Sequence, residues 1–71
     1  MKFRYVVYPG GVCRVYKMND RFGEIVWSSF STDPYIGLQE RPPAVITRDG
    51  DFEDEADSLE QFIEKHIEKF L

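Results

Sequence analysis

The C-terminal residues 58–71 alternate between apolar and polar side chains at the spacing of an α-helix. Five apolar side chains fall on one stripe of that helix: Leu59, Phe62, Ile63, Ile67 and Phe70. Ser58 and Gln61 form the S-x-x-Q pattern of a capping box, which indicates that the helix begins near Ser58. A helix of this length is marginally stable alone in water, so its apolar stripe must pack on the rest of the chain.

Three segments in the first half of the chain have the composition of β-strands. Residues 2–8, 12–18 and 24–30 are rich in aromatic and β-branched side chains. The segments between them, 9–11 and 19–23, carry proline, glycine, asparagine and aspartate, which favour turns. Short connections of this kind join antiparallel neighbours, so the three segments predict a β-meander.

The middle of the chain has weaker patterns. Residues 31–43 contain three prolines and no regular period, which indicates a loop that is unusually long for a small domain. We expect residues 44–47, AVIT, to form a short fourth strand at a sheet edge, and the acidic segment 49–57 to lead into the helix. The sequence therefore predicts a single α+β domain over residues 1–71, in which a three- to four-stranded antiparallel meander sheet carries one C-terminal amphipathic helix packed on one face.

Alternation along the predicted strands assigns their side chains to two faces of the sheet. One face is expected to lie under the helix and to contain Phe3, Tyr5, Val7, Cys13, Val15, Ile25 and Trp27. One helix covers one face, so the second face is expected to present Lys2, Arg4, Tyr8, Arg14, Tyr16, Val26 and Phe30. Three uses stay open for this second face: nucleic-acid binding, a homodimer interface, or a small second core covered by the long loop.

The length and composition of the chain restrict its class. A chain of 71 residues forms one domain with a small hydrophobic core. Its hydrophobic fraction of 42% and aromatic fraction of 15% are too high for a disordered protein. No apolar run is long enough to span a bilayer, and residues 1–11 lack the apolar core of a signal peptide. Cys13 is the single cysteine, which excludes an internal disulfide and favours the cytoplasm. We therefore expect a cytoplasmic protein, and the lack of a long apolar run predicts no membrane partner.

Candidate catalytic and metal-binding residues are few. Cys13 and His66 are the single members of their kinds, and their predicted positions in a strand and in the helix indicate packed side chains. Two such ligands do not complete a tetrahedral zinc site. Acidic residues from Asp49 to Glu60 follow the spacing of a calcium loop, but Asp54 stands where that loop requires glycine and no helix precedes it. We therefore expect a non-enzymatic protein with no catalytic residue, no metal and no cofactor.

Charge is distributed unevenly along the chain, whose formal net charge is −4. Basic residues concentrate in 1–22 and acidic residues in 49–71. Glu60, Glu64 and Glu68 are spaced to form one acidic column on the outer side of the helix, where like charges cost a few tenths of a kcal/mol per pair. This cost favours the hypothesis that the acidic face binds a basic surface on another protein, as a regulator or inhibitor would. The alternative is a solvated face that serves solubility.

The hypothesis of a basic protein partner assigns the contact to eight acidic residues: Asp51, Glu53, Asp54, Glu55, Asp57, Glu60, Glu64 and Glu68. A second hypothesis is single-stranded nucleic-acid binding, which would use the basic and aromatic residues Arg4, Tyr8, Arg14, Tyr16 and Phe30. The acidic net charge and the lack of a glycine-aromatic RNA-binding motif disfavour this second function.

Overall fold

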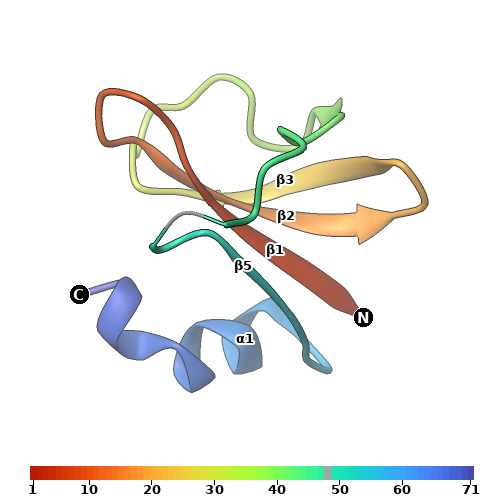
Figure 1. The fold of residues 1–71 in the computed structure, drawn as a ribbon, viewed down its shortest axis with the longest axis vertical. Coiled ribbons are helices and arrows are strands. Elements are labelled where there is room, and N and C mark those ends of the chain that lie inside the picture. The colour runs from red at the N-terminus through yellow and green to blue at the C-terminus, as the bar shows by residue number, and fades with distance from the viewer. Residues whose placement is uncertain (48) are drawn as a thin grey trace.

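A five-stranded antiparallel sheet forms the body of the protein (Figure 1). It is seen in a computed structural model, which describes residues 1–47 and 49–71. The strands are β1 (Lys2–Val7), β2 (Cys13–Asn19), β3 (Phe22–Ser28), β4 (Gln39–Glu40) and β5 (Phe52–Glu55), in the spatial order β4-β3-β2-β1-β5. The predicted α+β class, antiparallel sheet and C-terminal helix are confirmed, while the sheet has five strands rather than three to four.

The meander of β1, β2 and β3 follows the predicted order. The first turn uses Gly10 and Gly11, whose positive φ angles of 97° and 95° are readily adopted by residues without a Cβ. The second turn is tighter than predicted, since Asp20 enters the left-handed region at φ 55° and β3 already begins at Phe22. Aspartate is one of the few residues that tolerate this conformation, so a two-residue connection closes the hairpin.

A β-bulge in β3 changes the predicted assignment of side chains to faces. Val15 pairs with Trp27 and Tyr16 pairs with Ile25, which leaves Val26 as an extra residue on β3. Trp27 packs against the core cluster under the helix, whereas Ile25 is fully buried in the cluster on the opposite face. The predictions that Ile25 lies under the helix and that Val26 lies on the second face are therefore wrong, because the extra residue interrupts the alternation and Val26 packs against the cluster under the helix.

The two edge strands also differ from the prediction. Residues 44–47 form no strand, and the short edge strand β4 lies earlier, where it pairs with Gly23 and Glu24 of β3. At the other edge, the acidic segment expected to be a loop forms β5 and pairs with β1. This pairing places the Phe52 ring 5.2 Å from the Tyr5 ring on the helix side. The acidic composition of β5 is compatible with its place at the edge, because edge strands commonly carry charged residues that deter pairing with other chains.

The C-terminal helix is shorter than the predicted 58–71. Helix α1 spans Leu59–Lys65, begins at the N-cap Ser58, and ends at His66 with φ −123° and ψ 36°. A single 3₁₀ turn, η1 (Ile67–Lys69), follows. The change of direction leaves Ile67 48% exposed, so its predicted place in the apolar stripe is wrong. No helix among the described residues is long and apolar enough to cross a membrane.

Two apolar clusters lie on opposite faces of the sheet. The cluster under the helix is built on Phe3, Tyr5, Val15, Ala56 and Phe62, with Val7, Cys13, Trp27, Leu59 and Phe70 packed around it. The second cluster contains Val6, Tyr16 and Ile25. The connection between β3 and β5 folds back along this second face, as the green segments of Figure 1 show. The helix and this connection therefore cover different faces of one sheet.

Candidate functional site

The face predicted to be open, basic and aromatic is closed. Arg4 is 4% exposed and Tyr16 is fully buried, so neither side chain is available for stacking on nucleic-acid bases. Arg4 Nη2 donates a hydrogen bond to the carbonyl oxygen of Val45 at 3.0 Å, in the segment that crosses this face. Phe30 alone of the five residues assigned to nucleic-acid binding is more than half exposed. Of the uses left open by the sequence, this geometry favours the loop-covered second core.

Arg14 attaches the long connection to the sheet through several side-chain contacts. Its guanidinium donates to the Asp33 carboxylate at 2.8 Å and lies 3.7 Å from the Glu40 carboxylate. The same group lies over the rings of Tyr8 and Tyr35, 5.2 Å and 5.1 Å from their centroids. The hydrogen bonds from Arg14 lower the pKa of Asp33 to about 2, so this carboxylate is ionised at neutral pH. Arg14 therefore holds the loop to the sheet, while Tyr8 packs against its guanidinium.

Four of the eight predicted acidic binding residues make contacts within the protein. Asp51 Oδ1 accepts a hydrogen bond from the backbone N–H of Val7 at 2.7 Å. The other three lie on β5 and form ion pairs: Glu53 with Lys2 at 3.6 Å, Asp54 with Lys65 at 3.0 Å, and Glu55 with the N-terminal ammonium at 3.5 Å. These residues join β5 to β1 and α1, which gives each of them a structural role.

Asp54 links β5 to the end of the helix. Its Oδ2 lies 2.8 Å from His66 Nε2, in addition to the contact with Lys65. Hydrogen bonds from Lys65 and His66 lower the pKa of Asp54 to about 2. The His66 ring also packs against Phe52 and Phe62, with centroid distances of 4.4 Å and 5.1 Å. This cluster explains why the helix ends at His66, because the imidazole is held where α1 meets β5.

The remaining four acidic residues face solvent. Asp57, Glu60, Glu64 and Glu68 are all exposed, and none of them forms an ion pair with any residue in the described ranges 1–47 and 49–71. Glu60 and Glu64 lie one turn apart on α1, while Glu68 lies beyond the helix end on η1. The predicted column is thus interrupted at His66, but its carboxylates are not neutralised by arginines of the described chain. We call these four residues the acidic surface.

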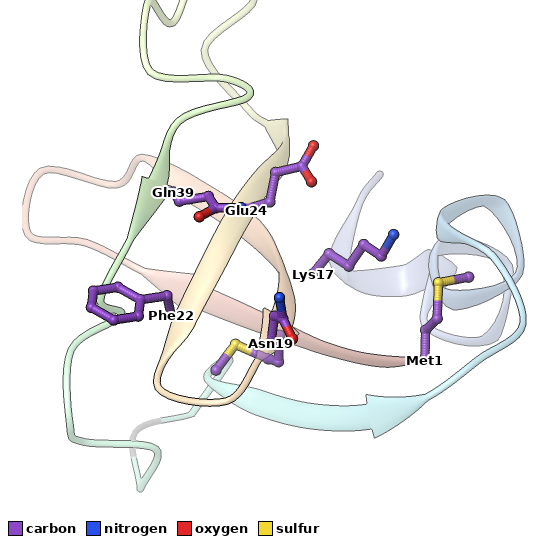
Figure 2. A pocket seen from close by; sticks show the side chains of 7 residues that line it. Met1, Lys17, Asn19, Phe22, Glu24 and Gln39 are labelled. Atoms are coloured by element: carbon purple, nitrogen blue, oxygen red, sulfur yellow. The ribbon is translucent and has the colours of Figure 1, made fainter.

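A surface hollow of about 380 Å³ lies on the helix side of the sheet, where α1 does not reach (Figure 2). Its lining residues are Met1, Lys17, Met18, Asn19, Phe22, Glu24 and Gln39. Cross-strand pairing aligns Lys17 with both Phe3 and Glu24, which places the hollow on the same face as the main core. Sequence reasoning missed this site, because its lining residues come from β2, β3, β4 and the N-terminus and are brought together by strand pairing. The one feature of the sequence that pointed to this hollow was Phe22, an apolar residue within a predicted turn.

Cys13 and His66 have different hydrogen-bond partners among the described residues and do not form a reactive pair. Cys13 packs at the edge of the main core and its thiol lies 3.7 Å from the carbonyl oxygen of Gly11. His66 is hydrogen-bonded to Asp54. Among the described residues, no group of three histidine, cysteine, aspartate or glutamate side chains is arranged to hold a metal ion. The acidic segment that resembles a calcium loop in spacing is largely the strand β5.

The chain matches no protein-family model, and comparisons with curated proteins and with solved structures found no match.

Proposed function

We propose that this protein is a small, non-enzymatic interaction module of the cytoplasm, a regulator or inhibitor that binds a basic surface of another protein through its acidic surface. The observation that carries the proposal is the division among the eight acidic residues. Four make internal contacts, while Asp57, Glu60, Glu64 and Glu68 are exposed without an ion pair to any described residue. The proposed contact therefore narrows to these four.

The position of the carboxylates relative to the helix supports a role beyond folding. Asp57 and Glu60 lie at the N-terminal end of α1, where a negative charge stabilises the helix. Glu64 lies in the last turn, where the helix dipole disfavours a carboxylate, and it stands one turn from Glu60. Glu68 follows on η1. The negative charges of Asp57 and Glu60 stabilise the helix, whereas that of Glu64 does not. A binding role is therefore most strongly indicated for Glu64 and Glu68.

Binding rather than catalysis is also supported by the surroundings of the two residues most often used in covalent or acid–base chemistry. Cys13 packs against the main core, and His66 ties the helix end to β5. An activated nucleophile requires a general base within hydrogen-bond distance. Among the described residues, Cys13 is hydrogen-bonded to the Gly11 carbonyl oxygen and the Tyr5 hydroxyl, and His66 is hydrogen-bonded to Asp54. The single cysteine of the chain is a free thiol, which suits a reducing compartment such as the cytoplasm.

The test is affinity capture from an extract of the source cell, with the bound proteins identified by mass spectrometry. The wild-type protein is compared with the double variant Glu64→Lys and Glu68→Lys. We expect the wild type to retain a basic protein that the double variant releases, and we expect high salt to release it as well. Retention of the same protein by both baits would contradict the proposal.

A matched pair of single substitutions controls for net charge. Glu64→Gln and Asp20→Asn each remove one exposed carboxylate that forms no ion pair with the described residues. The first should reduce capture and the second should leave it unchanged, because Asp20 lies in the β2–β3 turn. Sedimentation of each variant shows whether the partner is instead a second copy of this chain, which is the homodimer alternative.

A further inference from the structure

The hollow beside the helix has two apolar walls and two opposite charges. Met1 and Phe22 are 53% and 54% exposed, and both line the hollow. Asn19 lies between them, and the side chains of Lys17 and Glu24 rise from β2 and β3 in the next cross-strand row (Figure 2). The hollow has the volume of a small-ligand pocket, so it has room for a large apolar side chain of a bound protein and part of a neighbouring residue.

The two charged side chains in the hollow do not form an ion pair with each other. Lys17 and Glu24 are direct cross-strand partners on the same face, where opposite charges commonly pair. Within the described residues, however, neither side chain takes part in an ion pair. Glu24 is half-buried, whereas Lys17 is exposed. A carboxylate in that setting is available to a cation that enters from outside.

The hollow is connected to the acidic surface through Met1. The ammonium of Met1 donates to the carbonyl oxygen of Ala56 at 3.0 Å and lies 3.5 Å from the Glu55 carboxylate. Asp57 and α1 follow directly along the chain. A bound segment that leaves the hollow over Met1 therefore passes next to Glu55 and Ala56, directly before Asp57.

From this arrangement we infer that the hollow takes one apolar side chain of the basic partner, next to an arginine or lysine that pairs with Glu24. The inference rests on the proposed function, since it adds an anchor to the same contact. The apolar side chain packs between Met1 and Phe22, and the neighbouring cation contacts Glu24. Lys17 lies between Glu24 and β1, so the apolar residue of the segment, and not its cation, passes over Lys17 toward Met1.

Two short peptides serve as probes. One is a fluorescein-labelled, capped peptide of lysines and arginines with a single central leucine, and the other has serine in place of the leucine. Binding is followed by fluorescence anisotropy at low ionic strength. We expect the wild-type protein to bind the leucine peptide about fivefold to tenfold more tightly than the serine peptide, as partial burial of one leucine provides.

The structure offers a matched control for the wall of the hollow. Phe22 and Phe30 are equally exposed, at 54% and 53%, but Phe30 lies outside the hollow. Phe22→Thr should abolish the preference for leucine, and Phe30→Thr should retain it. Both variants should melt as the wild type does, because each removes a ring that is half in solvent. Equal affinity of the wild type for the two peptides, or a leucine preference that survives Phe22→Thr, would overturn the inference.

A third comparison separates this inference from the proposed function. The double variant Glu64→Lys and Glu68→Lys should weaken both peptides by the same factor and leave their ratio unchanged. If the two peptides bind the wild type equally but both are weakened by this reversal, the hollow is not an anchor and the acidic surface still binds. If the reversal changes neither affinity, the proposed function fails, and the leucine preference in the wild type still decides the role of the hollow.

Discussion

The Arg14 guanidinium and the Asp33 carboxylate, 19 residues apart in the chain, meet at 2.8 Å with the Asp33 side chain 2% exposed. This contact joins the middle of the sheet to the long connection that follows β3. It is accompanied by a backbone hydrogen bond from Tyr35 N–H to Asp33 Oδ1 at 3.0 Å. A face with the composition of a nucleic-acid binding site is thereby folded into a second core.

Removal of this charge should loosen the loop. Asp33→Asn keeps the size of the side chain but loses the ionic contact with Arg14, so hydrogen exchange of the Tyr35 and Leu38 amides should become faster. Asp20→Asn is the control, because Asp20 makes no ion pair with the described residues. Equal exchange at these amides in the wild type and in Asp33→Asn would show that the pair does not hold the loop.

The same carboxylate predicts how stability depends on acid. Folding lowers the pKa of Asp33 from 3.8 to about 2, so its contribution to stability is complete above pH 4 and is lost as the pH falls toward 2. Asp54, with a pKa of about 2, behaves in the same way. Denaturation at a series of pH values should show a shallower loss of stability over this range in Asp33→Asn than in the wild type. An equally steep loss in both proteins would contradict the Asp33 assignment.

The helix is expected to be anchored by Phe62. This side chain is fully buried, and its ring lies 5.4 Å from Phe3 and 5.6 Å from Phe52. Phe62→Ala should lower the free energy of unfolding by roughly 3–5 kcal/mol, as is typical for a buried phenylalanine. Ile67→Ala, at a residue 48% exposed, should cost less than about 1 kcal/mol. Chemical denaturation of both variants measures the difference, and equal losses would argue against this packing.

Replacing an acidic residue at the helix end should increase stability. Glu64→Gln removes repulsion from Glu60 and an unfavourable interaction with the helix dipole. We expect the free energy of unfolding to rise by a few tenths of a kcal/mol, measured by denaturation at low salt and reduced at high salt. A fall in stability would mean that Glu64 has a favourable intramolecular contact, and the case for its role in binding would lose its main support.

Local patterns in the sequence predict the parts of the fold that rest on neighbouring residues. The meander, the helix start at Ser58 and most of the core under the helix follow from alternation, turn chemistry and the capping pattern. Ser58 Oγ accepts a hydrogen bond from the Gln61 N–H at 3.1 Å, as the S-x-x-Q pattern predicts. The Gln61 side chain accepts instead from the Asp57 N–H, one residue before the cap.

The errors arise where contacts between distant residues override local preference. Strand β5 forms from an acidic segment because the free edge of β1 needs a partner and Phe52 adds a ring to the core. The apolar segment 44–47 crosses the second face instead of pairing as a strand. The bulge at Val26 moves Ile25 to the other face of the sheet. The two-residue alternation of a strand does not reveal where one extra residue is inserted.

The binding role of the acidic residues stays a prediction, and the structure bears only on their contacts and exposure. The sequence identifies acidic residues as candidates, but four of the eight contact Val7, Lys2, Lys65 or the N-terminus, which requires knowledge of the tertiary structure. Glu60 and Glu64 are exposed on the helix as its periodicity predicts. The hollow next to Met1 is lined by the N-terminus and by residues of β2, β3 and β4, so its position depends on strand pairing that local patterns do not give.

The most direct test of the central claim is the amount of basic partner captured by the wild type and by the double variant Glu64→Lys and Glu68→Lys, at equal bait and matched stability. The account predicts a loss of at least about tenfold in the double variant, as expected when two attractive charge contacts become repulsive. Capture that is equal for the two proteins would contradict the claim that the acidic surface binds the partner.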